Sequence, residues 1–109
     1  MKKMMLLTQA IRNSLPPLYA NEHKKPEDVP VCVKIFNPYG YGTWYLTEFD
    51  GEDIFFGLCC IHEAELGYVS LSELESLKIK VGGYGLPLER DKYWHGSLAD
   101  AIAEERNKR

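Results

Sequence analysis

Apolar and polar residues alternate through the first half of the chain in the pattern of β-strands. Residues 31–36 carry β-branched side chains at every second position, and residues 43–49 and 53–61 are two further apolar runs. The Asp50-Gly51 pair between the last two runs is a strong hairpin signal, because a type I′ turn needs positive φ at both central residues. The three runs are therefore predicted to form an antiparallel meander.

The second of these runs has large apolar side chains at both odd and even positions. Alternation predicts Trp44 and Leu46 on one face and Tyr45 and Phe49 on the other. A strand with two apolar faces needs cover on both sides. We therefore predict that other elements pack against each face of the sheet.

Three segments show helical spacing of apolar residues together with helix-start signals. Each begins at a Ser or Thr whose hydroxyl can accept a backbone N–H, and the second and third also have an acidic residue three positions later. The first segment ends at a Pro-Pro pair, which cannot continue a helix. Helices are therefore predicted over residues 8–15, 70–77 and 97–107.

Shorter elements complete the prediction. One helical turn is expected at residues 63–66, closed by Gly67, and short strands are expected at residues 78–81 and 86–89 on either side of the Gly-rich segment 82–85. The resulting fold class is α+β, with a central antiparallel sheet of four to five strands and three short helices packed on it.

The chain length fits one domain. All 109 residues are predicted to form a single unit, within which residues 20–30 are a polar loop and residues 106–109 a frayed basic tail. Hydrophobic residues make up 45% of the chain, which excludes disorder by composition. The apolar run at the N-terminus stops at Thr8, short of the about 7–15 apolar residues of a signal peptide, and no stretch approaches the ~20 needed to span a membrane. A cytoplasmic protein without membrane contact is expected.

Charge is distributed unevenly. Residues 35–77 hold eight Asp and Glu and no Lys or Arg, whereas residues 1–34 and 78–109 carry more basic than acidic residues. Nucleic-acid binding requires a basic footprint, so the acidic middle argues against it and favours a basic protein partner. The alternative is that the acidic residues are an ordinary solvated surface.

An acidic hairpin and an aromatic, glycine-rich turn are the candidate binding surface. Aromatic side chains with few competing charges are typical anchors of protein interfaces. The candidate partner-binding residues are Tyr39, Tyr41, Trp44, Glu48, Asp50, Glu52 and Asp53. The alternative assigns Trp44 to the core and the acidic residues to a solvated turn.

Catalytic and metal signatures are weak. Cys59 and Cys60 would point to opposite faces of a strand, so they cannot both bind one ion, and no second ligand pair accompanies them and His62. A Cys–His or Ser–His–Asp arrangement that used His95 and Asp91 lacks any local signature. We predict no catalytic residues, no metal and no cofactor. Three cysteines, two of them adjacent, are a poor disulfide framework and suit a reducing compartment.

Six segments, in order, resemble a small bacterial family of domains of unknown function that is often encoded on plasmids, conjugative elements and phages. They are Leu15-Pro-Pro-Leu-Tyr19, Thr43-Trp-Tyr-Leu-Thr-Glu-Phe-Asp-Gly-Glu-Asp53, Phe56-Gly57, Glu65-Leu-Gly-Tyr68, Ser70-Leu-Ser-Glu-Leu74 and Leu88-Glu-Arg-Asp91. The resemblance implies an accessory protein of a mobile element. It brings no activity and no functional residues.

The hypothesis favoured by these observations is a non-enzymatic protein-binding accessory, related to conjugation or anti-defence, that presents the acidic and aromatic residues to a basic partner. A small carboxylate-dependent hydrolase or nuclease-like enzyme is the alternative, and it would be favoured by an inward-pointing Glu48 with a second acid in a cleft. A nucleic-acid-binding module is the third hypothesis. It would need a contiguous basic face, formed by lysines 2, 3, 24, 25, 78 and 80.

Overall fold

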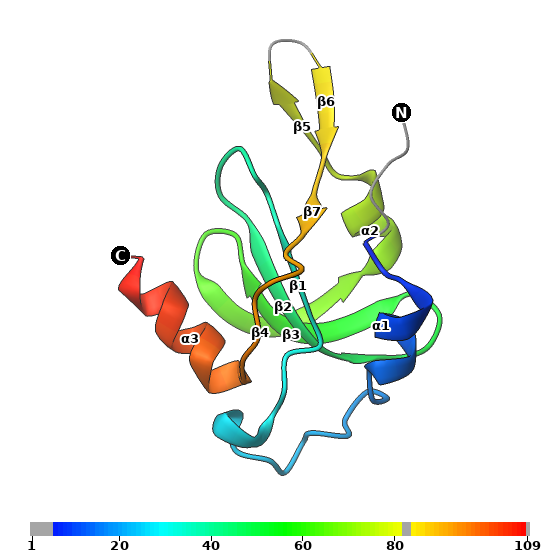
Figure 1. Ribbon diagram of the computed structural model, residues 1–109, viewed down its shortest axis with the longest axis vertical. Helices are drawn as coiled ribbons and strands as arrows, with labels where there is room; N and C mark the ends of the chain where they lie inside the picture. Colours follow the sequence, from blue (N-terminus) through cyan, green and yellow to red (C-terminus); the bar gives the residue numbers. More distant parts are fainter. Residues whose placement is uncertain (1–5, 82–83, 109) are drawn as a thin grey trace.

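A five-stranded antiparallel sheet forms the centre of the molecule (Figure 1). The computed structural model describes residues 6–81 and 84–108, with side chains described for residues 6–77 and 88–108. The strands lie in the order β4-β3-β2-β1-β7. Their bounds are Val33–Phe36 for β1, Thr43–Phe49 for β2, Ile54–Cys60 for β3, Ala64–Ser70 for β4 and Glu89–Arg90 for β7. The predicted α+β class and the predicted meander are confirmed.

A separate two-stranded hairpin projects from the sheet (Figure 1). It consists of β5, Lys78–Val81, and β6, Tyr84–Pro87. The strand predicted at 86–89 is therefore wrong in its bounds, because Leu88 separates β6 from β7. Half of the predicted Gly-rich connection, Gly82 and Gly83, lies outside the described residues.

All three predicted helices are present. They are α1, Gln9–Ser14, α2, Leu71–Ser76, and α3, Leu98–Asn107. A hydroxyl caps each N-terminus as predicted, and Ser97 with Asp100 forms the full capping box. The polar loop at 20–30 also contains a short 3-10 helix, η1, Pro26–Asp28.

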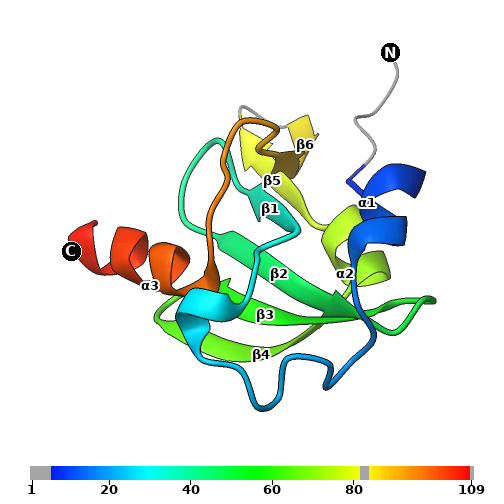
Figure 2. The same cartoon turned by 60° about the horizontal axis from the view of Figure 1, so that its bottom comes forward.

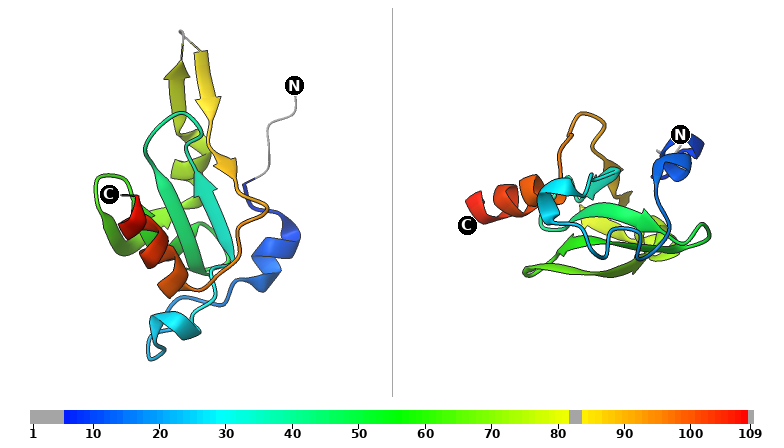
Figure 3. Two further views of the ribbon diagram at one scale, coloured as in Figure 1. Left: turned by 60° about the vertical axis from the view of Figure 1, so that its left-hand side comes forward. Right: turned by 90° about the horizontal axis from the view of Figure 1, so that it is seen from below.

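Each face of the sheet is covered by its own apolar cluster, as predicted. On one face Trp44 and Leu46 pack with residues of the N-terminal segment and of α2, including Leu74. On the other face Tyr45 packs with Val29 and with α3 residues, including Leu98. Figures 2 and 3 show α3 and α1 toward opposite ends of the central strands.

A β-bulge in β2 changes which residues share a face. Leu46 pairs with Gly57 and Glu48 pairs with Phe56, so Thr47 is the extra residue. Beyond the bulge the alternation is shifted by one residue, and Phe49 joins the cluster of Trp44 and Leu46. The predicted placement of Phe49 on the Tyr45 face is therefore wrong, and Glu48 instead takes the face that carries Tyr45.

The turn between β2 and β3 is longer than the predicted type I′ turn. The Asp50 N–H donates to the Ile54 carbonyl oxygen over 2.9 Å, and positive φ occurs at Gly51 but not at Asp50. The Asp50 carboxylate accepts the backbone N–H groups of Glu52, Asp53 and Ile54 at 2.8–3.0 Å. Side-chain bonding to the turn thus takes the place of a second residue with positive φ.

The helical turn predicted at residues 63–66 is wrong. Residues 64–70 form β4, which pairs with β3 from Ala64 opposite Cys60 to Ser70 opposite Ile54. A cross-strand ring contact between Phe56 and Tyr68, with 5.1 Å between centroids, adds to the ladder. Pairing along the whole of β3 outweighs the weak helical preference of a few residues.

Candidate functional site

The structure separates the two halves of the predicted binding surface. Tyr39 and Tyr41 lie before the first residue of β2, and the acidic turn 50–53 follows its last residue. A seven-residue strand spans roughly 20 Å, so the aromatic loop and the acidic turn lie at opposite ends of the sheet. Trp44 is 4% exposed and belongs to the core, which corrects its placement on the binding surface.

Two of the predicted acidic residues, Asp50 and Asp53, accept hydrogen bonds from backbone N–H groups. Three backbone N–H groups bond the Asp50 carboxylate, and those bonds lower its pKa below the ordinary value. The Asp53 carboxylate accepts the Ser72 N–H at 2.8 Å and the Ser72 hydroxyl at 3.0 Å, which ties the turn to the start of α2. Of the turn acids, Glu52 is exposed and available to a partner.

Glu48 is not part of the exposed turn. Its side chain is buried, at 4% exposure, and its two carboxylate oxygens accept the backbone N–H groups of Tyr19 at 2.7 Å and Asn21 at 3.0 Å. These bonds fasten the loop that follows α1 onto the sheet. Tyr19 has φ of 72°, a left-handed conformation that is uncommon for a bulky residue and is held in place by the carboxylate.

A cavity of about 280 Å³ lies beside Glu48, between the 19–26 loop and the face of β3 and β4. Its walls are mostly apolar and include Phe56 and Tyr68. A hydrogen bond with Tyr19 and the nearby charges of Glu48 raise the pKa of Tyr68. The remaining lining residues are Asn21, Glu22, Lys24, Pro26, Val29, Thr47, Leu66 and Leu98.

The outer part of this face is apolar and exposed. Leu66 is 53% exposed and Tyr68 is 54% exposed, both on β4, which is the outer strand of the described sheet. Beyond Leu66 a hollow continues between β4 and α3, with Leu58 and Ile102 in its walls. The cavity and this hollow share Leu66, and together we call them the β4 groove.

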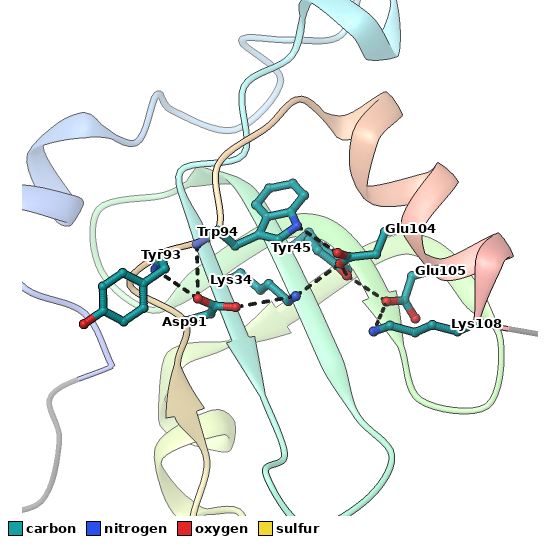
Figure 4. A network of polar contacts seen from close by, with 8 residues as sticks. All are labelled: Lys34, Tyr45, Asp91, Tyr93, Trp94, Glu104, Glu105 and Lys108. Carbon is teal, nitrogen blue, oxygen red and sulfur yellow. Dashed lines mark hydrogen bonds and ion pairs between the residues drawn. The ribbon is translucent and has the colours of Figure 1, made fainter.

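A network of polar contacts joins α3 to the sheet (Figure 4). The ammonium group of Lys34 lies 3.1 Å from a Glu104 carboxylate oxygen and 3.7 Å from an Asp91 oxygen. It also lies 5.2 Å from the ring centroid of Tyr45 and 5.6 Å from that of Trp94. A nearly buried cation is thus held between two carboxylates and two aromatic rings.

The Tyr45 hydroxyl lies between two carboxylates of α3. Its oxygen is 2.5 Å from a Glu104 oxygen and 2.7 Å from a Glu105 oxygen. Burial alone would raise the pKa of Glu104. The hydrogen bonds from Tyr45 and Lys34 have the larger combined effect, so the pKa of Glu104 lies below its ordinary value. Tyr45 is fully buried, so its hydroxyl is held inside the network. The network therefore positions α3 against the sheet.

The cysteines occupy opposite faces, as predicted. Cys59 packs against the cluster of Trp44, and Cys60 belongs to the cluster of Tyr45. Burial raises the pKa of Cys60 to about 12, and burial also raises the pKa values of Cys59 and Cys32. Such thiols are poor nucleophiles near neutral pH. Within the described part of the chain, no three His, Cys, Asp or Glu side chains form a group able to hold a metal ion.

Cys60 is expected to resist alkylation in the folded protein. Its thiol is buried and stays protonated at pH 8, because its pKa of about 12 lies far above that pH. Iodoacetamide at pH 8, followed by mass spectrometry of peptides, should label Cys60 more slowly than the half-buried Cys32, and both rapidly after unfolding. Labelling of Cys60 at the rate of the unfolded chain would contradict its burial.

Comparison with known proteins gives one finding. Residues 6–103 match a family model described as "Protein of unknown function (DUF2958)". The chain belongs to this family. The match confirms the resemblance to a domain of unknown function and covers most of the single predicted domain. Neither the curated proteins nor the solved structures contain a match to this chain. Among the described residues, no helix is long and apolar enough to cross a membrane.

Sequence reasoning missed the cavity beside Glu48, because its walls come from five separate segments. Glu48 itself was assigned to the exposed hairpin. A signal was nevertheless present: Tyr19, Glu48, Phe56 and Tyr68 each lie in one of the segments on which the family resemblance rests. These segments meet at the cavity.

Proposed function

We propose that this protein is a non-enzymatic protein-binding accessory that receives a basic partner in the β4 groove. The observation that carries the proposal is the exposure of Leu66 and Tyr68 on the outer strand of the sheet. Exposed aromatic and aliphatic side chains in a groove are typical anchors for a partner chain. An outer strand also offers unpaired backbone groups to an extended segment of the partner.

Charge supports a basic partner. No Lys or Arg occurs between residues 35 and 77, which include β2, β3 and β4. Glu63 and Glu65 are exposed on the outer edge of the sheet, where they line a shallow hollow together with Leu66 and Tyr68. The groove itself is lined by three carboxylates, of Glu22, Glu48 and Glu105, and by two cations, Lys24 and Arg106. Together with the two acids beside β4 these groups give a net negative charge, which attracts basic segments during encounter and repels the phosphates of nucleic acid.

The family resemblance supports a mobile-element setting. For an accessory protein of a mobile element, a host or conjugation protein with a basic, nucleic-acid-binding surface is the partner that we propose. An acidic groove that occupies such a surface would serve an anti-defence role. The nucleic-acid-binding alternative needs a basic face formed by lysines 2, 3, 24, 25, 78 and 80. The side chains of lysines 2, 3, 78 and 80 lie outside the described residues.

A small carboxylate-dependent hydrolase is the second candidate. Glu48 points into a cavity that Glu22 also lines, which is the arrangement expected to favour this hypothesis. Both oxygens of Glu48 already accept backbone N–H groups, however, so this carboxylate anchors the loop at Tyr19 and Asn21. A general base works by taking up a proton, and a proton on Glu48 would compete with these two N–H groups for its oxygens, whereas a bound cation would not; we therefore favour protein binding.

Neutralising the acids on the outer edge of the sheet should slow partner binding. The double variant Glu63→Gln, Glu65→Gln removes two exposed charges beside Leu66 and Tyr68, and neither side chain takes part in a hydrogen bond described for this structure. Its association rate with a partner captured from the native host and identified by mass spectrometry should fall roughly threefold to tenfold at low salt, with a weaker salt dependence. Stopped-flow or surface plasmon resonance measures both.

Glu52→Gln is the matched control, because Glu52 is an exposed acid on the turn at the end of β2. It should change the association rate less than the double variant does. Asp50 and Asp53 are unsuitable, since both bind backbone N–H groups. An unchanged rate for the double variant, or wild-type binding to DNA or RNA at physiological salt, would refute the proposal.

A further inference from the structure

Glu48 is a buried carboxylate for which no basic partner occurs among the described residues. Its carboxylate accepts two backbone N–H groups, and none of the described Lys or Arg side chains forms an ion pair with it. A carboxylate that is ionised away from water requires compensation, and a carboxylate can accept more than two hydrogen bonds. The open side of Glu48 faces the cavity of about 280 Å³.

The walls of the cavity suit a cation. Tyr19, Phe56 and Tyr68 supply three aromatic rings, and Phe56 and Tyr68 meet edge to face. The faces of aromatic rings attract cations. A hydrogen bond with Tyr19 is the main cause of the raised pKa of Tyr68, and the charges of Glu48 and Glu22 raise it further, so both carboxylates contribute negative potential at the cavity.

Aromatic rings and carboxylates surround a cation at another place in the molecule. Around Lys34, two aromatic rings and two carboxylates hold one ammonium group (Figure 4). The cavity beside Glu48 repeats the rings and carboxylates but has no cation among the described contacts. Lys24 lines the cavity, yet its side chain is exposed and is more than 4 Å from any described carboxylate.

Asn21 lines the cavity and also has an unpartnered polar group. Its side-chain amide nitrogen has almost no accessible surface and has no hydrogen-bond acceptor within the described residues. A buried donor without an acceptor costs free energy. A bound segment would accept a hydrogen bond from this nitrogen only if the amide turned toward the cavity.

We propose that the cavity beside Glu48 binds the guanidinium group of an arginine side chain presented by the partner. This site rests on the proposed function, since it names the chemistry by which a basic partner is recognised. Guanidinium is weakly hydrated, always charged and stacks on aromatic faces, so it fits these walls better than an ammonium group. The volume of about 280 Å³ is small for an independent ligand and suits one side chain.

The test uses Nα-acetyl-arginine methylamide as the probe and needs no partner protein. Titration into the ¹⁵N-labelled full chain should shift the amide signals of Tyr19 and Asn21, because both N–H groups bond to Glu48. The citrulline counterpart has nearly the same shape without the charge, and it should bind at least about tenfold more weakly. Equal binding of both probes, or shifts confined to other residues, would overturn the site.

Variants separate the site from the fold. Tyr68→Leu keeps apolar bulk on an exposed strand position but removes a ring, and it should weaken arginine binding about fivefold. Tyr41→Leu is the control, because Tyr41 does not line the cavity. Glu48→Gln should abolish charge selectivity if it folds, and Tyr68→Leu decides the question if it does not. Equal affinities of the Tyr68 and Tyr41 variants would overturn the site.

Lys24→Met tests whether the protein fills its own cavity. An exposed Lys24 predicts unchanged stability and equal or tighter arginine binding for this variant. Reduced stability together with tighter binding would show that Lys24 is the resident cation and would overturn the proposal. If the arginine probe does not bind, but a basic partner still binds and the Glu63→Gln, Glu65→Gln variant slows its association, the arginine site alone is refuted. An intact arginine site in a chain that binds only nucleic acid refutes the proposed function instead.

Discussion

Replacement of Trp44 by alanine is expected to lower the free energy of unfolding by about 3–5 kcal/mol. The indole is 4% exposed and packs in the cluster that joins the sheet to α2 and the N-terminal segment. Its removal loses transfer free energy and leaves a cavity that the surrounding side chains fill only in part. Urea denaturation followed by circular dichroism measures the change.

Tyr41→Ala is the control for this prediction. Tyr41 is 93% exposed, so loss of its ring should change stability by no more than about 0.5 kcal/mol. A loss below about 1 kcal/mol for Trp44→Ala would contradict the core position of the tryptophan and return it to the candidate binding surface.

Gly57→Ala should destabilise the protein by about 3 kcal/mol or more, the upper end for an added methyl group in a packed interior. A Cβ at Gly57 would overlap the carbonyl oxygen of Tyr45 and lie 2.8 Å from Cα of Leu46. Both atoms belong to the backbone of β2, so they cannot move aside as a side chain would. Thermal and urea unfolding measure the loss.

Gly67→Ala provides a matched control within the same sheet. Gly67 pairs with Gly57 across β3 and β4, but a Cβ there would meet no atom within 4 Å. Its stability should change by less than about 1 kcal/mol, since alanine fits an open strand position. Equal destabilisation by the two substitutions would show that loss of glycine flexibility, and not the overlap with β2, is the cause.

The sequence predicts helices and strands correctly where neighbouring residues determine where the element begins and ends. The helix at 98–107 begins at Ser97 because the hydroxyl and the Asp100 carboxylate satisfy backbone N–H groups within four residues of one another. The strands of the meander alternate clearly. β4 was missed because its residues are mostly exposed, and its strand conformation depends on pairing with β3.

The candidate site depends on the β-bulge in β2, which the alternation of apolar and polar residues does not reveal. The bulge at Thr47 turns Glu48 away from its expected face and into the cavity, while Phe49 turns toward the core. A one-residue insertion in the ladder leaves no clear mark in the hydrophobic pattern. The loop that brings Tyr19 and Asn21 to Glu48 is likewise set by contacts 27–29 residues apart.

The place of β7 in the sheet bears on the order of folding. β2, β3 and β4 are joined by short connections, so their ladders close small loops and can form early. β7 is two residues long and pairs Arg90 with Ile35, far away in sequence, so this contact requires closure of a long loop. We therefore expect the meander to form the nucleus. β7 and α3 would then dock last. The contact between Lys34 of β1 and Glu104 of α3 would form only after the rest of the chain has folded.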